Sequence, residues 1–186
     1  MPLNQGRAIL TVADLREWQE LTERALMDDP VLAEVMKDPR RIFNQDETPL
    51  CPGVQHQRVL TPKGWTGPVY NKGGDSRLHV TSSVTVSADG EYMGVRLVYK
   101  GSRNRYQQVK KIPKTGVTGE WRCSVAPKGY VNREVYLDIL GDLVEHIQEK
   151  NIPTPVILFI DGYGGHLSPE ISDFCTENGI VLRLLR

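Results

Sequence analysis

Apolar residues recur at helical spacing in four stretches of the chain. The first begins at Thr11, which forms a short capping box with Asp14, and the second begins at residues 29–30, an Asp-Pro pair. The third follows Asn132, and the fourth begins at residues 168–170, where Ser, Pro and Glu are typical of a helix start. The apolar face of the third consists of Val135, Tyr136, Ile139, Leu140, Leu143, Val144 and Ile147. We predict four helices, of which the first two pack as a lead-in against a sheet.

Short apolar runs predict an antiparallel sheet in the first half of the chain. Residues 78–87 and 93–99 alternate between apolar and polar positions, and the Asp-Gly pair at residues 89–90 between them is a hairpin signal. Residues 42–43 begin a further strand, and residues 55–60 are a short strand candidate. These segments predict an antiparallel meander.

Two further strands follow the third and fourth helices. Residues 156–160 are all apolar, which is the pattern of a strand buried on both faces of a parallel sheet. Residues 180–185 form a last strand, parallel to the first of these by the right-handed crossover rule. By contrast, residues 101–129 show little periodicity and are predicted as a long loop, which at that length is usually functional or disordered.

The order of the elements predicts the fold class. Three antiparallel strands are followed by helix, strand, helix and strand, with a carboxylate on the first strand and another after the fourth. This order suits an α/β ribonuclease H-like mixed sheet. We expect residues 1–40 to be a helical lead-in and residues 41–186 to form the main domain.

Carboxylates at strand ends are the first candidates for chemistry. Asp161 stands where an apolar run stops, and ligands bind at the carboxyl ends of strands in open α/β sheets. An Asp-Gly pair also starts turns, so a structural role is the alternative. Asp46 and Glu47 interrupt a strand, where carboxylates are costly unless they are paired or bound to a metal. A surface strand edge is the alternative for these two.

Composition excludes several classes of protein. The chain of 186 residues is long enough for one domain with a core, and 25% charged residues are ordinary for a soluble protein. Its apolar runs are far shorter than a membrane span, and its first residues lack the core of a signal peptide. Cys51, Cys123 and Cys175 are scattered, which favours a reducing compartment and argues against a zinc site.

Charge is unevenly distributed, although the net charge is zero. The stretch from Arg96 to Arg133 contains ten basic residues and one acid, with aromatic residues interleaved. Such a block suits a nucleic-acid phosphate backbone. A solvated loop that balances the acidic N-terminal segment is the alternative.

Four short motifs follow one another at spacings that suggest a family. They are Asn-Gln-Asp-Glu-Thr at residues 44–48, the hairpin at residues 82–101, Lys-Gly-Tyr-Val-Asn at residues 128–132 and the Asp-Gly segment at residues 159–168. Together they resemble the DDE superfamily endonuclease domain of eukaryotic transposases of the pogo, Tigger and jerky type, in the Tc1/mariner group. The resemblance covers about residues 40–186.

The resemblance implies a catalytic site with divalent cations. Asp46 and Asp161 match the family's first two catalytic acids and are the expected ligands of Mg²⁺ or Mn²⁺, since hard cations prefer carboxylate oxygens. Two ions about 3.5–4 Å apart activate water or a DNA 3′-hydroxyl and stabilise the leaving oxygen. Glu47 is expected behind these ligands or at the surface. No residue matches the family's third acid, because Glu170 and Asp173 belong to a different helix.

The resemblance also implies DNA as a partner and the nucleus as the location. We expect Lys110, Lys111, Arg122 and Lys128 to contact the DNA backbone, with affinity and not sequence specificity as the result. His166 is a further candidate for a phosphate contact, and a hydrogen bond from its ring to the backbone is the alternative. Whether the chain pairs with a second copy is left open.

Three functions are compatible with these observations. The chain is a metal-dependent endonuclease and strand-transfer domain, an inactive, truncated or host-adopted version that binds DNA or protein, or a structural domain whose basic loop is incidental. The unmatched third acid distinguishes an active endonuclease from an inactive version. Salt-dependent DNA binding distinguishes both of these from a structural domain. Because no third acid is matched, we expect residues 1–186 to bind cations weakly and to cleave DNA poorly or not at all.

Overall fold

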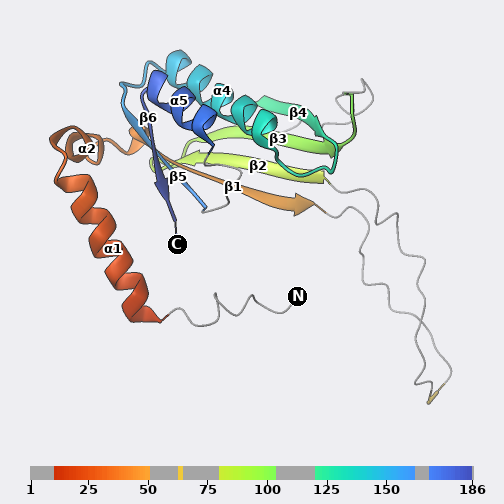
Figure 1. Ribbon diagram of the computed structural model, residues 1–186, viewed down its shortest axis with the longest axis horizontal. Coiled ribbons are helices and arrows are strands. Elements are labelled where there is room, and N and C mark those ends of the chain that lie inside the picture. The colour runs from red at the N-terminus through yellow and green to blue at the C-terminus, as the bar shows by residue number, and fades with distance from the viewer. Residues whose placement is uncertain (1–10, 51–62, 65–79, 104–119, 162–167, 186) are drawn as a thin grey trace.

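A mixed β-sheet forms the centre of the molecule (Figure 1). The computed structural model describes residues 11–50, 63–64, 80–103, 120–161 and 168–185. The strands in this part of the chain are β1 (Ile42–Leu50), β2 (Val80–Ser87), β3 (Tyr92–Lys100), β4 (Glu120–Ala126), β5 (Val156–Ile160) and β6 (Ile180–Leu184). The helices are α1 (Val12–Met27), α2 (Pro30–Val35), the short 3₁₀ helix η1 (Pro39–Arg41), α4 (Arg133–Glu149) and α5 (Pro169–Glu177).

The strand order confirms the predicted fold class. The strands lie in the order β4-β3-β2-β1-β5-β6. β1, β2 and β3 are antiparallel neighbours, and β5 and β6 run parallel to β1 on its other side. This is a ribonuclease H-like mixed sheet, with β4 added at one edge. The strand candidate at residues 55–60 lies outside the described residues.

β4 corrects the prediction of an unbroken loop over residues 101–129. The strand pairs in parallel with β3, so that Gly94 faces Glu120 and Lys100 faces Ala126. Its side chains alternate: Trp121 packs on an apolar cluster of one sheet face, while Arg122 bonds to α4 on the other. The many basic residues of this stretch obscured the alternation of side chains that is typical of a strand. Pairing with β3 supplies the backbone hydrogen bonds that a loop would lack.

The main core lies between the sheet and the helices α4 and α5, which cover one face (Figure 1). α4 buries the face that its periodicity predicts, and only Val144 of that set is partly exposed. Asn132 caps this helix by accepting a hydrogen bond from the Val135 N–H at 3.0 Å. α5 ends as predicted, since Gly179 has a φ of +67° and a Cβ there would lie 2.9 Å from Thr154.

β5 is buried on both faces, as its continuous apolar run predicts. Val156, Leu158 and Ile160 belong to the core under α4 and α5. Ile157 belongs to a second cluster on the opposite face, where it packs with Leu26, Leu32 and Val35 of α1 and α2. This strand therefore joins the two layers of the fold.

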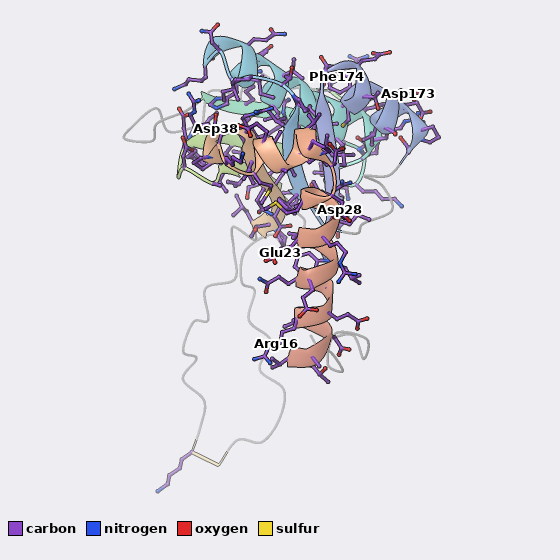
Figure 2. The ribbon with its side chains drawn as sticks, turned by 90° about the vertical axis from the view of Figure 1, so that its left-hand side faces the viewer. Arg16, Glu23, Asp28, Asp38, Asp173 and Phe174 are labelled. Carbon is purple, nitrogen blue, oxygen red and sulfur yellow. The ribbon has the colours of Figure 1, made fainter. Side chains whose placement is uncertain are left out.

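α1 packs less closely than its apolar stripe predicts. Leu26 in its last turn is buried, but Leu15 is 47% exposed and Leu21 is 50% exposed. Figure 2 shows Arg16 and Glu23 along the part of α1 that projects from the body of the fold. The helix is thus anchored at its C-terminal end, and its capping box at Thr11 stabilises the projecting end. Among the described residues, no helix has the length and apolarity that a membrane span needs.

A cluster around His146 fastens the C-terminal end of α4 to the β2–β3 hairpin. Glu91 in the hairpin bonds to Lys150 at 2.5 Å, and its other carboxylate oxygen lies 3.7 Å from the imidazole Nε2 of His146. The imidazole stands edge-on to the ring of Phe43, with centroids 6.2 Å apart. Burial lowers the pKa of His146, and this effect outweighs the opposite effect of Glu91.

We expect the free energy of unfolding to decrease as the pH falls below about 6.5, the ordinary histidine value. The folded protein resists protonation of His146, so the unfolded chain binds more protons in that range. The stability that His146 contributes is present above this value and is lost as the pH falls toward its lowered pKa. Urea unfolding of wild type and His146→Gln between pH 5 and 8 measures the effect. Equal pH slopes in the two proteins would contradict it.

Candidate active site

Parallel pairing of β1 with β5 leads toward both predicted catalytic acids. The last register pair of these strands is Asn44 with Phe159. Asp46 and Asp161 each follow that pair by two residues, so both acids lie beyond the same end of the β1–β5 pairing. Asp46 lies on the sheet face opposite α4, because strand residues alternate and Phe43, three residues earlier, enters the core beneath α4. That the two carboxylates form one site stays a prediction.

Asp46 lies in the middle of β1, opposite Val84 of β2. Its side chain is exposed, and its Oδ1 accepts a hydrogen bond from the Glu47 N–H at 2.8 Å. Exposure removes the cost that a carboxylate within a buried strand would carry. Asp46 is thus an exposed strand residue, and its role as a metal ligand stays a prediction.

Asp161 directly follows the buried strand β5 and is half-buried. Its charge reaches the interior, because it contributes to raising the pKa of the fully buried Tyr136. Burial is the largest cause of that rise, followed by the charge of Glu47. The charges of Glu47 and Asp161 thus both act on Tyr136 of α4 in the direction that burial already sets.

Glu47 points to the α4 side of the sheet, opposite to Asp46, because successive strand residues alternate. It is half-buried, and one carboxylate oxygen accepts a hydrogen bond from the Gln45 side-chain amide at 2.8 Å. The same amide donates to the hydroxyl of Ser83 at 2.9 Å. Glu47 therefore belongs to a polar layer on the α4 side of the sheet, and its place relative to a metal site stays a prediction.

The acid pair suits a hard divalent cation in the type of its donor atoms. Asp46 and Asp161 supply carboxylate oxygens, which Mg²⁺ and Mn²⁺ prefer. Among the residues that the structure describes, no group of three or more His, Cys, Asp or Glu side chains is arranged to hold a metal. Glu170 bonds to Arg133 at 2.8 Å, and Asp173 is exposed on α5 (Figure 2). Neither of these two adds a ligand to the pair.

Arg122, predicted to contact DNA, is bound within the fold. Its guanidinium bonds to Asp142 at 2.5 Å and to Glu145 at 2.6 Å, both on α4. Arg96 on the neighbouring strand also bonds to Asp142, at 2.6 Å, and to Ser124 at 2.7 Å. A contact of Arg122 with phosphate would compete with these ion pairs, so its role in DNA binding stays a prediction.

Of the remaining predicted DNA contacts, Lys128 lies within the described residues. Lys128 is exposed in the turn between β4 and α4. Lys110, Lys111 and His166 lie outside the described residues. Their roles stay predictions as well.

Sequence reasoning missed the acidic partners of this basic block. Asp138, Asp142 and Glu145 follow one another at spacings of four and three residues, which places them on one side of α4. Asp138 accepts a hydrogen bond from Ser124 and lies 3.6 Å from Arg96. This acidic stripe is the signal that could have paired the helix with basic strands.

Comparison with known proteins identifies structures of similar fold. No protein-family model matches the sequence, and no curated protein matches it. Among solved structures, the Mos1 transposase paired-end complex with left transposon end has 14% sequence identity and a TM-score of 0.48, covering 82% of this chain and 38% of that chain. The Mos1 mariner paired end complex with Mn has 13% identity and a TM-score of 0.49, with coverages of 82% and 38%. This chain therefore spans less than two fifths of the chains that it matches, and the similarity concerns the fold alone.

We expect Asp142→Asn to lower the free energy of unfolding by roughly 1–3 kcal/mol, because two arginines lose a charged acceptor. The side chains of Arg96 and Asp142 are only 12% and 22% exposed, so water replaces the lost bonds poorly. Glu145→Gln is the matched control: that side chain is 56% exposed and pairs with Arg122, so its loss should cost below about 1 kcal/mol. Denaturant unfolding measures the free energy of unfolding of both variants. Equal losses would contradict the prediction that Asp142 contributes more than Glu145.

Proposed function

We propose that this chain is a DDE-type endonuclease domain of a Tc1/mariner-like transposase, of the pogo, Tigger and jerky type. Its activity would be metal-dependent hydrolysis and strand transfer of DNA phosphodiester bonds when the domain is complete. The observation that carries the proposal is the parallel pairing of β1 with β5, whose last pair precedes Asp46 and Asp161 by two residues. The motifs that contain these two residues support it, as does the ribonuclease H-like strand order.

Asp46 and Asp161 are the residues that would hold Mg²⁺ or Mn²⁺ in a two-ion site. When bound, such ions neutralise the phosphate charge and make water or a 3′-hydroxyl a stronger nucleophile. The protein's own part is to hold the two carboxylates at one end of the β1–β5 pairing. β5, buried on both sides, fixes the position of Asp161, and pairing of β1 with β2 and β5 fixes Asp46.

The polar layer behind the site supports this arrangement. Gln45 bonds to Glu47 and Ser83, which restrains the backbone of β1 on either side of Asp46. Tyr136 fills the space beneath the strand ends without a charge of its own, since burial raises its pKa. The negative charges of Asp46, Glu47 and Asp161 would favour a cation at this end of the sheet.

The proposed partner is DNA, bound through its phosphate backbone by Lys110, Lys111 and Lys128, with His166 near the scissile phosphate. Lys128 is exposed and near the start of α4, which supports its part in such a surface. A DNA substrate makes the nucleus the proposed location.

Calorimetric titration of Mn²⁺ tests the metal site. We expect weak binding to the wild type that disappears in Asp46→Asn, Asp161→Asn, because the two carboxylates form one site. The matched control is Glu170→Gln, Asp173→Asn, which removes two acids of α5 and should leave binding unchanged. Equal binding in wild type and the first double variant, or none in either, would favour a module that binds DNA or protein without catalysis.

DNA binding should weaken steeply with salt, because each phosphate contact releases counterions. The logarithm of the affinity falls by about 0.9 per neutralised phosphate for each tenfold rise in salt. We expect Lys110→Ala, Lys111→Ala, Lys128→Ala to reduce this slope by about 2–3, as measured by fluorescence anisotropy of labelled duplex DNA. Lys37→Ala, just after α2, where Lys37 pairs with Glu34, is the control. An unchanged slope in the triple variant would rule out this surface.

A further inference from the structure

A cleft of about 580 Å³ lies between the C-terminal half of α4 and the β2–β3 hairpin, and we name it the Thr85 cleft. Its volume is within the range of roughly 300–1,000 Å³ that is common for small-molecule pockets. The cleft is on the α4 side of the sheet, whereas Asp46 is on the opposite face. The metal chemistry proposed above therefore makes no use of it.

An irregularity of the sheet forms the floor of this cleft. The register of β2 with β3 shifts between Val84 and Val86. Thr85 therefore stands against two residues of β3, Met93 and Gly94, which is a β-bulge. Gly94 has a φ of +107°, a conformation that other residues rarely adopt, and it contributes no side chain to the cleft. Bulges re-aim side chains and leave local backbone unpaired, so the floor is a polar surface open to a ligand.

The hydroxyl of Thr85 is a buried group that lacks a partner. Thr85 is only 7% exposed and lines the cleft. Within the described part of the chain, its hydroxyl makes no hydrogen bond. By contrast, Ser83 and Ser87 on the same face of β2 bond to Gln45 and Asp89. A buried hydroxyl without a partner costs free energy, and a ligand with a hydrogen-bond donor would supply that partner.

Negative charge exceeds positive charge around the cleft. The lysine and arginines that line it, Arg96, Arg122 and Lys150, each bond to an acid of the lining. Burial lowers the pKa of His146, which also lines the cleft, and thus favours its neutral form. Glu149 is exposed at the mouth and forms no ion pair among the described residues. A cation is therefore the ligand that the charges favour.

The position of Glu149 is itself unfavourable for a free carboxylate. It is the last residue of α4, where the negative end of the helix dipole repels an acid. Glu145 lies four residues earlier on the same side of the helix, and like charges at this spacing repel each other. A cation bound beside Glu149 would relieve both effects.

The lining favours an organic cation over a bare metal ion. Among the residues that the structure describes, no group of three or more His, Cys, Asp or Glu side chains is arranged to hold a metal. Met93 and Ile139 give the cleft an apolar wall, which a hydrated ion cannot use. An aliphatic amine matches both parts of the lining, because it joins methylene groups to an ammonium with three N–H donors.

We propose that the Thr85 cleft binds a linear aliphatic diamine or polyamine. One ammonium donates a hydrogen bond to the hydroxyl of Thr85, and another lies beside Glu149 at the mouth. The methylene chain between them packs against Met93 and Ile139. This binding site is independent of the endonuclease chemistry, so either proposal can fail alone.

Calorimetric titration with 1,4-diaminobutane tests the site. We expect Thr85→Val to weaken binding roughly tenfold or more, because a hydrogen bond to a charged group is lost. Thr85→Ser keeps the hydroxyl and should retain the affinity. Glu149→Gln should weaken binding roughly two- to fivefold, the range for an exposed ion pair. Glu134→Gln is the matched control, since Glu134 is an exposed acid of the same helix that does not line the cleft.

Two further measurements separate loss of binding from loss of folding or from surface binding. Thr85→Val should unfold in urea at the same concentration as wild type or higher without amine, because it removes an unpaired buried hydroxyl. In proton NMR spectra, the diamine should shift the ring resonance of His146, assigned with His146→Gln, more than those of the other histidines.

Three outcomes would overturn the proposal. The first is equal affinity of wild type and Thr85→Val for the diamine, or binding to neither. The second is equal binding of 1,4-butanediol, which has the same chain without charge. The third is equal binding of N-acetyl-lysine amide, which would assign the cleft to a lysine side chain of a partner protein in place of a free amine.

Discussion

Burial of β5 on both faces is the constraint on which the rest of the structure depends. Three of its side chains enter the core beneath α4 and α5, and Ile157 enters the cluster formed by α1 and α2. A strand with no polar side chain has no stable place other than between two layers. Because β5 is central, β1 and β6 are held on either side of it, and the residue that follows it, Asp161, emerges at a defined point of the sheet edge.

A polar layer replaces apolar packing over the other half of the sheet. The face of β2 beneath α4 carries Thr81, Ser83, Thr85 and Ser87, all buried. Buried hydroxyls need partners, and several find them in side chains and carbonyls nearby. Farther along, arginines of β3 and β4 bond to the acidic side of α4. Part of the basic block thus holds the edge strand to the helix, so charge density along the chain does not by itself identify a surface for DNA.

Particular residues show how far prediction from the sequence reached. The face of α4 and the capping of its start at Asn132 were predictable, because helical period and cap chemistry are local properties. The exposure of Leu15 and Leu21 of α1 was not predictable, because tertiary contacts decide which part of a helix packs against the sheet. β4 was hidden for a similar reason: its stability comes from β3 and α4, both distant in the chain. The acids at 46 and 161 were identified from motifs, whereas the pairing of the strands that precede them is a property of the sheet.

By itself, the sequence determined the elements, the fold class and the two carboxylates that candidate chemistry needs. These features depend on residues that are close in the sequence: the period of apolar positions, the cap residues of helices and the acids that end strands. They can therefore be recognised from the sequence alone. Tertiary structure alone decided that β1 pairs with β5, that the charges of Glu47 and Asp161 act on Tyr136, and that Trp18 and Phe159 line one cleft. These relations join residues more than a hundred positions apart or on separate layers, and only packing of the sheet between its helices sets such distances.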